Sequence, residues 1–235
     1  MTTIKEKEKQ NFKEMTVKQK FSHLWEYYKI HGLIIVLFVS FIIYGIYSAS
    51  KPKIDTSLYV AVVNNNLAGP TLDQITEEAE NYLHLDPDKE KVFLNSIFYF
   101  HSDNDYSTNA RRALITYVAA SEVDIIIAPE SEFANYAYND LFHNLTNQLP
   151  TDLYTTLAND FYISDTEYEE EKLPYGIYLH NAKYYNENYY FVRESRSMDQ
   201  SDEEVTDEPY VLGIIVNSSN LNNSLDFIRY LFDQN

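Results

Sequence analysis

Cysteine is absent from the 235-residue sequence, and glycine occurs only five times. The absence of cysteine excludes disulfide bonds, thiolate metal sites, a cysteine nucleophile and lipid attachment through a lipobox cysteine. The scarcity of glycine argues against loops that cradle phosphate groups, and the sequence has no P-loop, dinucleotide-binding or GxSxG pattern. A domain without cross-links must be held together by its own core or by a partner.

Basic residues are concentrated at the start of the chain. Residues 1–50 carry seven lysines against four glutamates, a balance of +3, so residues 51–235 must carry −21 to give the net charge of −18. Such an acidic body repels nucleic-acid phosphates and anionic lipid, and we expect no nucleic-acid partner. The charge fits a domain that stays soluble outside a negatively charged cell surface, or one that meets a basic partner or cations.

One long apolar run follows the lysines. Residues 32–47 read GLIIVLFVSFIIYGIY, and 21 residues separate Lys29 from Lys51 without a charge. At about 1.5 Å per residue this run spans a hydrocarbon core of roughly 30 Å. Aromatic residues near both of its ends match the belts found at membrane interfaces. Residues 30–50 are therefore predicted to form a transmembrane helix.

The lysines also predict the orientation of this helix. Residues 1–29 would be a cytoplasmic, Lys-rich juxtamembrane segment, and residues 51–235 an extracellular acidic α/β domain. The alternative is a cleaved signal peptide, since Ser48 and Ser50 are small enough for a cleavage site. Against it, about 30 residues precede an apolar stretch that exceeds the usual 7–15 residues.

Short apolar runs alternate with amphipathic segments in the acidic region. Strands are expected at residues 57–63, 92–100, 123–128, 176–179, 189–193 and 210–216, and helices at 71–83, 107–121 and 221–232, with shorter helices after residue 129 and within 149–164. This alternation predicts right-handed crossovers and a largely parallel sheet with helices on both faces.

Two segments resemble the extracytoplasmic solute-binding proteins of ABC transporters. Residues 123–150 begin VDIIIAPESEF, a strand, turn and short helix, and residues 210–232 read YVLGIIVNSSNLNNSLDFIRYLF, a closing strand, an Asn-Ser turn and a helix. The resemblance implies a periplasmic-binding-protein-like single lobe with a reduced second lobe, because 185 residues are too few for two full lobes. The Lys-rich start and single span also resemble membrane-anchored proteins of low-GC Gram-positive bacteria.

The candidate ligand-binding residues follow from the expected sheet. In an open parallel sheet, ligands bind outside the carboxyl ends of the strands. Polar loop residues at the ends of the expected strands are the candidates: Asn64, Asn65, Asp103, Asp105, Glu130, Ser131, Asn217 and Ser218. Ordinary turn chemistry explains each of them taken alone.

No residue pattern predicts a catalytic site, a metal or a cofactor. The six histidines show no metal-ligand spacing. Asp103, Asn104 and Asp105 begin like a calcium loop, but the sixth position is not glycine and the twelfth is Leu114. The sequence therefore favours a membrane-tethered, non-catalytic module that engages a protein partner or a small ligand. The alternatives are an accessory subunit of a membrane transporter complex, and a cell-surface hydrolase whose site has no recognisable motif.

Overall fold

The structure is a computed structural model, and it describes residues 16–50, 53–65, 69–100, 105–183, 185–186, 189–190 and 208–233. The chain divides into two units, Met1–Lys53 and Ile54–Asn235.

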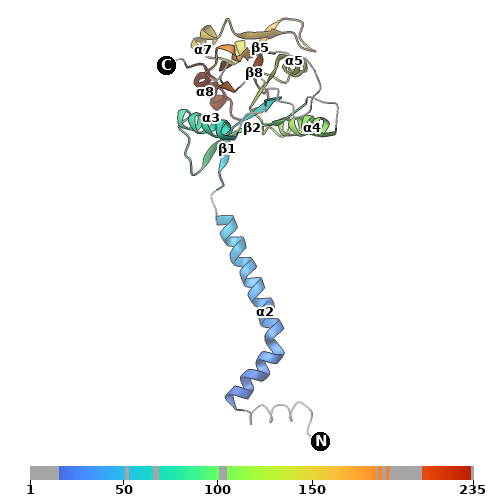
Figure 1. Ribbon diagram of the computed structural model, residues 1–235, viewed down its shortest axis with the longest axis vertical. Helices are drawn as coiled ribbons and strands as arrows, with labels where there is room; N and C mark the ends of the chain where they lie inside the picture. Colours follow the sequence, from blue (N-terminus) through green and yellow to red (C-terminus); the bar gives the residue numbers. More distant parts are fainter. Residues whose placement is uncertain are drawn as a thin grey trace. The chain divides into compact units, whose positions relative to one another are not determined.

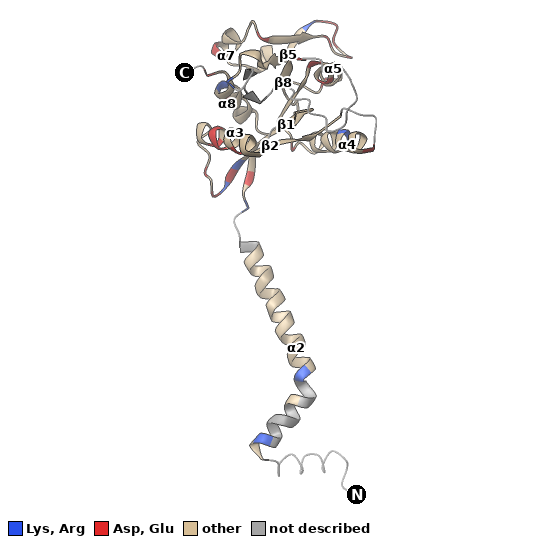
Figure 2. Ribbon diagram, viewed as in Figure 1, with Lys and Arg blue, Asp and Glu red and all other residues tan. Residues whose placement is uncertain are grey.

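The first unit contains a single long helix among its described residues, α2 (Val17–Ser50). Its stretch Lys29–Ser48 is the only described segment long and apolar enough to cross a membrane. These 20 residues correspond to about 30 Å of helix. Figure 2 shows basic residues only in the first part of α2, and the sequence carries no charge from Ile30 to Ser50. The predicted apolar helix is confirmed by its length and composition.

The second unit is a mixed α/β domain in which helices flank a six-stranded sheet (Figure 1). The sheet contains β1 (Asp55–Val63), β2 (Glu90–Phe98), β3 (Ile125–Pro129), β4 (Phe161–Ser164), β5 (Leu173–Tyr178) and β8 (Tyr210–Ile214). The helices are α3 (Gly69–Tyr82), α4 (Asp105–Ala119), α5 (Glu130–Tyr138), α6 (Leu145–Gln148), α7 (Thr151–Thr156), the 3₁₀ turn η1 (Leu179–Asn181) and α8 (Leu221–Phe232). A separate two-stranded ribbon joins β6 (Tyr185–Asn186) to β7 (Tyr189–Tyr190).

The strand order is β2-β1-β3-β8-β5-β4. Strands β2, β1 and β3 are parallel, as the sequence predicts, whereas β8 pairs antiparallel with both β3 and β5, and β4 pairs antiparallel with β5. The α/β class is therefore confirmed, with a mixed sheet in place of a largely parallel one. The strand expected at 176–179 is β5, which begins at residue 173, and β4 was not anticipated. The strand expected at 189–193 coincides with β7 at its start and otherwise lies outside the described residues.

Each face of the sheet has its own hydrophobic core, which confirms the predicted helices on both faces. Alternate residues of β1 divide between the faces, with Leu58, Val60 and Val62 in one core and Tyr59 and Ala61 in the other. Helices α3, α6, α7 and α8 cover the first face, and α4 and α5 cover the second. A strand covered on both faces must be apolar along its whole length, which is why β1 reads as a continuous apolar run.

Two glycines make room for an aromatic pair on the second face. The rings of Phe133 and Phe142 stack with centroids 4.3 Å apart. A Cβ atom on Gly213 would lie 2.6 Å from Phe142 and 2.8 Å from Phe133, and one on Gly176 would lie 2.6 Å from Phe133. The bare backbones of β5 and β8 thus allow α5 to pack closely on the sheet.

A buried aspartate lies at the end of the sheet where β3 begins. Asp124, just before β3, has an exposed fraction of 0%. Its carboxylate accepts hydrogen bonds from the backbone N–H of Tyr59 at 2.8 Å, the hydroxyl of Ser218 at 2.6 Å and the amide of Asn220 at 3.2 Å. Its own N–H donates to the carbonyl of Tyr59, and its carbonyl accepts from Ile215 N–H. One residue therefore joins β1, β3 and the turn between β8 and α8.

We predict that Asp124→Ala lowers the free energy of unfolding by about 3 kcal/mol, because the buried N–H of Tyr59 and the partly buried side chains of Ser218 and Asn220 lose their acceptor at once. Asp73→Ala removes an exposed aspartate from α3 and serves as the control, with an expected change below about 0.5 kcal/mol. Chemical denaturation followed by near-ultraviolet circular dichroism measures both. Equal stability of the two variants would contradict the role given to Asp124.

Candidate functional site

The carboxyl ends of the parallel strands meet at one edge of the sheet. From β1 the chain passes to α3 on one face, and from the neighbouring β3 it passes to α5 on the other face. A point where connections leave neighbouring strands in opposite directions is where open α/β sheets bind ligands. The carboxyl-edge site is the name used below for the polar residues after β1 and β3 and for the side chains that contact them or lie next to them. These residues are Asn64, Asn65, Glu130, Ser131, Glu208, Arg111 and Glu132.

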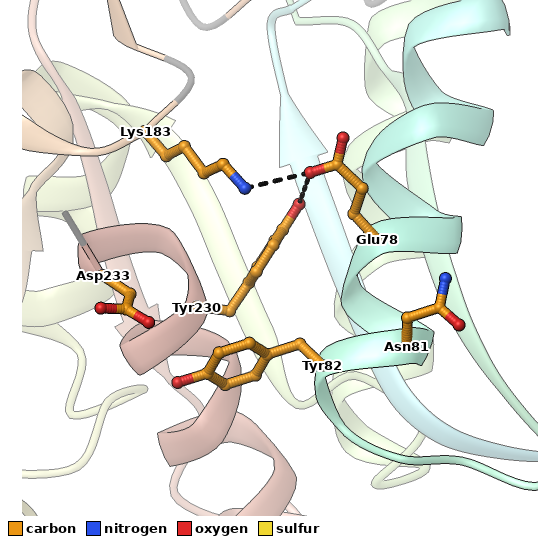
Figure 3. A pocket seen from close by; sticks show the side chains of 6 residues that line it. All are labelled: Glu78, Asn81, Tyr82, Lys183, Tyr230 and Asp233. Carbon is orange, nitrogen blue, oxygen red and sulfur yellow. Dashed lines mark hydrogen bonds and ion pairs between the residues drawn. The ribbon is translucent and has the colours of Figure 1, made fainter. Parts of the chain in front are cut away.

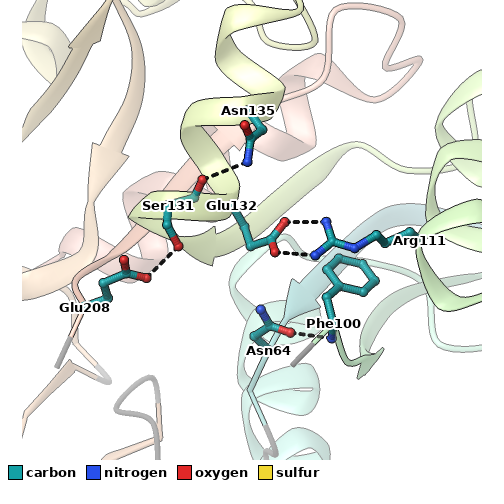
Figure 4. A network of polar contacts seen from close by, with 7 residues as sticks. All are labelled: Asn64, Phe100, Arg111, Ser131, Glu132, Asn135 and Glu208. Atoms are coloured by element: carbon teal, nitrogen blue, oxygen red, sulfur yellow. Dashed lines mark hydrogen bonds and ion pairs between the residues drawn. The ribbon is translucent and has the colours of Figure 1, made fainter. Parts of the chain in front are cut away.

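Asn64 braces this site. It adopts a left-handed backbone conformation with φ of 54°, which asparagine tolerates better than most residues. Its side-chain oxygen accepts from the backbone N–H of Phe100 at 2.7 Å, as Figure 4 shows, and its carbonyl accepts from the hydroxyl of Tyr210 at 2.7 Å. Asn64 therefore joins the ends of β1 and β2 to the start of β8 through its side-chain oxygen and its backbone carbonyl.

Asn65 differs from its neighbour. Its exposed fraction is 3%, and its side-chain nitrogen is buried and has no hydrogen-bond partner in the described part of the chain. A buried amide donor without an acceptor costs about 1–3 kcal/mol. Such a group is rare in a folded protein, and this one lies at the switch point where open α/β sheets bind ligands.

Glu130 and Ser131 begin α5 directly after β3. Glu130 accepts a hydrogen bond from the hydroxyl of Tyr178 at 3.0 Å. The hydroxyl of Ser131 donates to Glu208 at 2.8 Å (Figure 4). These contacts tie the end of β3 to β5 and to the segment that leads into β8, and they leave carboxylate oxygens at the carboxyl-edge site.

An arginine–glutamate pair that the sequence did not single out completes this site. Both terminal nitrogens of Arg111, on α4, donate to the carboxylate of Glu132, on α5, at 2.8 and 2.6 Å. The guanidinium also lies over the ring of Phe100, 4.5 Å from its centroid. Figure 4 shows the three side chains next to Asn64. The only sequence signal was the rarity of arginine in an acidic domain.

The remaining candidates are Asp103, Asp105, Asn217 and Ser218. Asp105 is the first residue of α4 and is exposed, and Asp103 lies outside the described residues. Asn217 and Ser218 follow the carboxyl end of β8, but β8 runs antiparallel to β3, so they lie at the opposite edge of the sheet. There Asn217 donates to the carbonyl of Val118 at 2.8 Å, and Ser218 belongs to the Asp124 network.

The sequence gave no indication of a pocket between α3 and α8. It has a volume of about 370 Å³ and is lined by Glu78, Asn81, Tyr82, Lys183, Tyr230 and Asp233 (Figure 3). A smaller pocket of about 190 Å³ shares Tyr82 and Asp233 with it and is also lined by Asp152 and Arg229. The lining of both pockets comes from segments far apart in the chain, so no local sequence pattern indicated either pocket.

The described residues contain no group of three or more His, Cys, Asp or Glu side chains that could hold a metal ion. The carboxyl-edge site instead offers amide and carboxylate groups for hydrogen bonding. Comparison of the chain with protein-family models, curated proteins and solved structures gave no match. The function therefore has to be argued from the geometry, and the resemblance to solute-binding proteins stays a prediction.

The tyrosine beside Glu130 provides a test of the geometry at the carboxyl-edge site. Burial, followed by the hydrogen bond to Glu130 and its negative charge, raises the pKa of Tyr178 to about 12. We predict that Glu130→Gln moves this pKa back towards the ordinary tyrosine value of about 10. Nuclear magnetic resonance titration of ring-labelled tyrosine, assigned with Tyr178→Phe, measures it.

This pKa shift determines how the stability of the fold changes with pH. The folded state keeps the phenol proton to a higher pH than the unfolded state, so the contact stabilises the fold fully below about pH 10 and is lost as the pH rises towards 12. An unchanged pKa in Glu130→Gln would mean that the Tyr178–Glu130 hydrogen bond does not persist in solution.

Proposed function

We propose that the protein is a membrane-tethered binding module, in which α2 anchors the chain and the α/β domain binds a ligand outside the cell without catalysis. The observation that carries this proposal is the buried side-chain nitrogen of Asn65 at the carboxyl-edge site, which has no hydrogen-bond partner among the described residues. The apolar stretch of α2 supports the tether.

The arrangement in the membrane rests on charge. Lysines precede the apolar stretch, whereas the region after it carries a net charge of −21. Segments rich in lysine stay on the cytoplasmic side, and residues 1–29 are therefore assigned to the cytoplasm. The acidic domain then lies outside, where its charge keeps it soluble and apart from anionic surfaces.

The ligand must match the groups at the carboxyl-edge site. The amide nitrogen of Asn65 requires an acceptor, and the carboxylates of Glu130 and Glu208 can accept further hydrogen bonds. These carboxylates disfavour an anion, while Arg111 is already paired with Glu132. A small neutral molecule with hydroxyl or amide groups satisfies both requirements. The same groups would also fit the backbone of an extended peptide segment from a protein partner.

A relationship to one lobe of a solute-binding protein remains part of this proposal. The two resembling segments, residues 123–150 and 210–232, contain β3–α5 and β8–α8. Strands β3 and β8 are neighbours in the sheet, so the resembling segments form one continuous part of the domain. Strands β5 and β4 belong to the same sheet, so the described residues after 54 form one lobe without a separate second sheet of that size.

Substitution of Asn65 tests the proposed site. Full-length protein is purified from native membranes in mild detergent, and bound small molecules and proteins are identified by mass spectrometry. We predict that Asn65→Leu loses the bound molecule by tenfold or more, about 1.4 kcal/mol. The same variant should be at least as stable as the ligand-free wild type, because an unsatisfied buried donor is removed.

Asn222→Leu, at an exposed position of α8, is the matched control and should retain the bound molecule. A small molecule would identify the solute, and a stoichiometric membrane protein would identify a partner complex. Equal recovery of the bound species with Asn65→Leu and wild type would exclude the carboxyl-edge site as the binding site. A wild-type protein that carries nothing would contradict the proposed function.

A further inference from the structure

The pocket between α3 and α8 lies where two helices end. Tyr82 is the last residue of α3, and Asp233 directly follows the last residue of α8. Both residues line the pocket. The last turn of a helix has carbonyl groups without intrahelical partners and carries a partial negative charge, which favours cations. The two helix ends therefore favour a cation at this pocket, although some of their carbonyl groups already accept backbone hydrogen bonds, such as that of Leu231 from the N–H of Lys183.

The side chains of the pocket also favour a cation. Glu78 and Asp233 contribute carboxylates, and Tyr82 and Tyr230 contribute aromatic rings with centroids 5.6 Å apart. The faces of aromatic rings attract cations, and the attraction grows when the cation is partly withdrawn from water. The pocket thus combines three features that each favour positive charge: helix carboxyl ends, carboxylates and aromatic faces.

A lysine of the chain already uses part of this environment. The ammonium nitrogen of Lys183 lies 3.1 Å from a carboxylate oxygen of Glu78 and 4.9 Å from the ring centroid of Tyr230. The hydroxyl of Tyr230 donates to the same oxygen of Glu78 at 3.1 Å. Figure 3 shows these three groups in contact along one side of the pocket. This side of the pocket is therefore suited to an ammonium group.

Asp233 lies apart from that contact and is exposed (Figure 3). Among the described residues it has no ion-pair partner, because the cation of the adjoining pocket, Arg229, pairs with Asp152 and Asp226. One carboxylate of the pocket is therefore balanced by Lys183, while the other faces about 370 Å³ of open space.

We propose that this pocket binds a small organic ammonium ion, a primary amine, with Asp233 and the tyrosine rings as its counter-groups. Lys183 is an internal competitor: its ammonium group neutralises Glu78 and lowers the affinity of the pocket for an added amine. This site is separate from the carboxyl-edge site and does not depend on the function proposed for it. The amine can belong to a free polyamine or to a lysine side chain of a peptide, since both present the same group.

Binding of a single-charge probe tests the proposal. Isothermal titration calorimetry measures Nα-acetyl-lysine amide binding to full-length protein in a neutral detergent at about 150 mM salt, where charges beyond about 8 Å are screened. We expect saturable binding that weakens about fivefold or more in Asp233→Asn and tightens about three- to tenfold in Lys183→Met. The diacetylated probe, which lacks the ammonium group, should not bind.

Asp73→Asn is the matched control for Asp233→Asn, because it removes the same charge from an exposed position of α3. Equal weakening in both variants would show general attraction to an acidic protein and would overturn the proposal. Lys183→Gln repeats the test of competition without introducing an apolar side chain, and weaker binding in both Lys183 variants would also overturn it.

Spermidine distinguishes the two sources of the amine. Much tighter binding of spermidine than of the lysine probe, lost in Asp233→Asn, assigns the pocket to a free polyamine. Comparable binding of the two assigns it to a lysine side chain. The absence of saturable binding of either probe to Lys183→Met, with its near-ultraviolet circular dichroism unchanged, would refute the site.

Discussion

The domain depends on the buried carboxylate of Asp124, whose partners among the described residues are all neutral donors. Asp124 brings together β1, β3 and the turn before α8, and these are the elements that bring the parallel and antiparallel halves of the sheet together. A chain without cysteine has no covalent means of fixing that junction. Burying a charge is costly, and it becomes tolerable here because backbone, hydroxyl and amide groups all donate to the same carboxylate.

The two edges of the sheet differ because of this network. At the Asp124 edge, the candidate residues Asn217 and Ser218 have partners within the chain. At the other edge, the side-chain oxygen of Asn64 accepts a hydrogen bond, and Asn65 keeps a buried donor without an acceptor among the described residues. The edge that is closed by internal hydrogen bonds holds the fold, and the proposed binding site lies at the other edge.

The elements with strong local patterns were predictable from the sequence. Strands β1, β3 and β8 are buried on both faces, so each appears in the sequence as a continuous apolar run. Strand β4 was not anticipated, and β5 was expected only from residue 176, because Pro174 and Gly176 weaken its strand pattern. Pro174 is accommodated at an irregularity in the pairing of β4 with β5, and Gly176 leaves space for Phe133.

The candidate site was predictable only in part, because the sequence indicated the parallel strands but not the direction of β8. Asn64, Asn65, Glu130 and Ser131 lie together because the strands before them are parallel, which the sequence indicated. The direction of β8 is a tertiary property, set by packing and by the Asp124 network, and no local pattern encodes it. The pocket between α3 and α8 likewise joins Glu78 to Lys183, more than one hundred residues apart in the chain.

The central claim is that α2 crosses the membrane with the acidic domain outside, and site-directed labelling tests it most directly. Because the chain contains no cysteine, single cysteines at Lys18 and at Tyr168, which is 82% exposed, report on one side each. The account predicts that a membrane-impermeant maleimide labels Tyr168→Cys on intact cells and labels Lys18→Cys only after permeabilisation. The reverse pattern, or a chain released from the membrane fraction with its N-terminal segment removed, would contradict it.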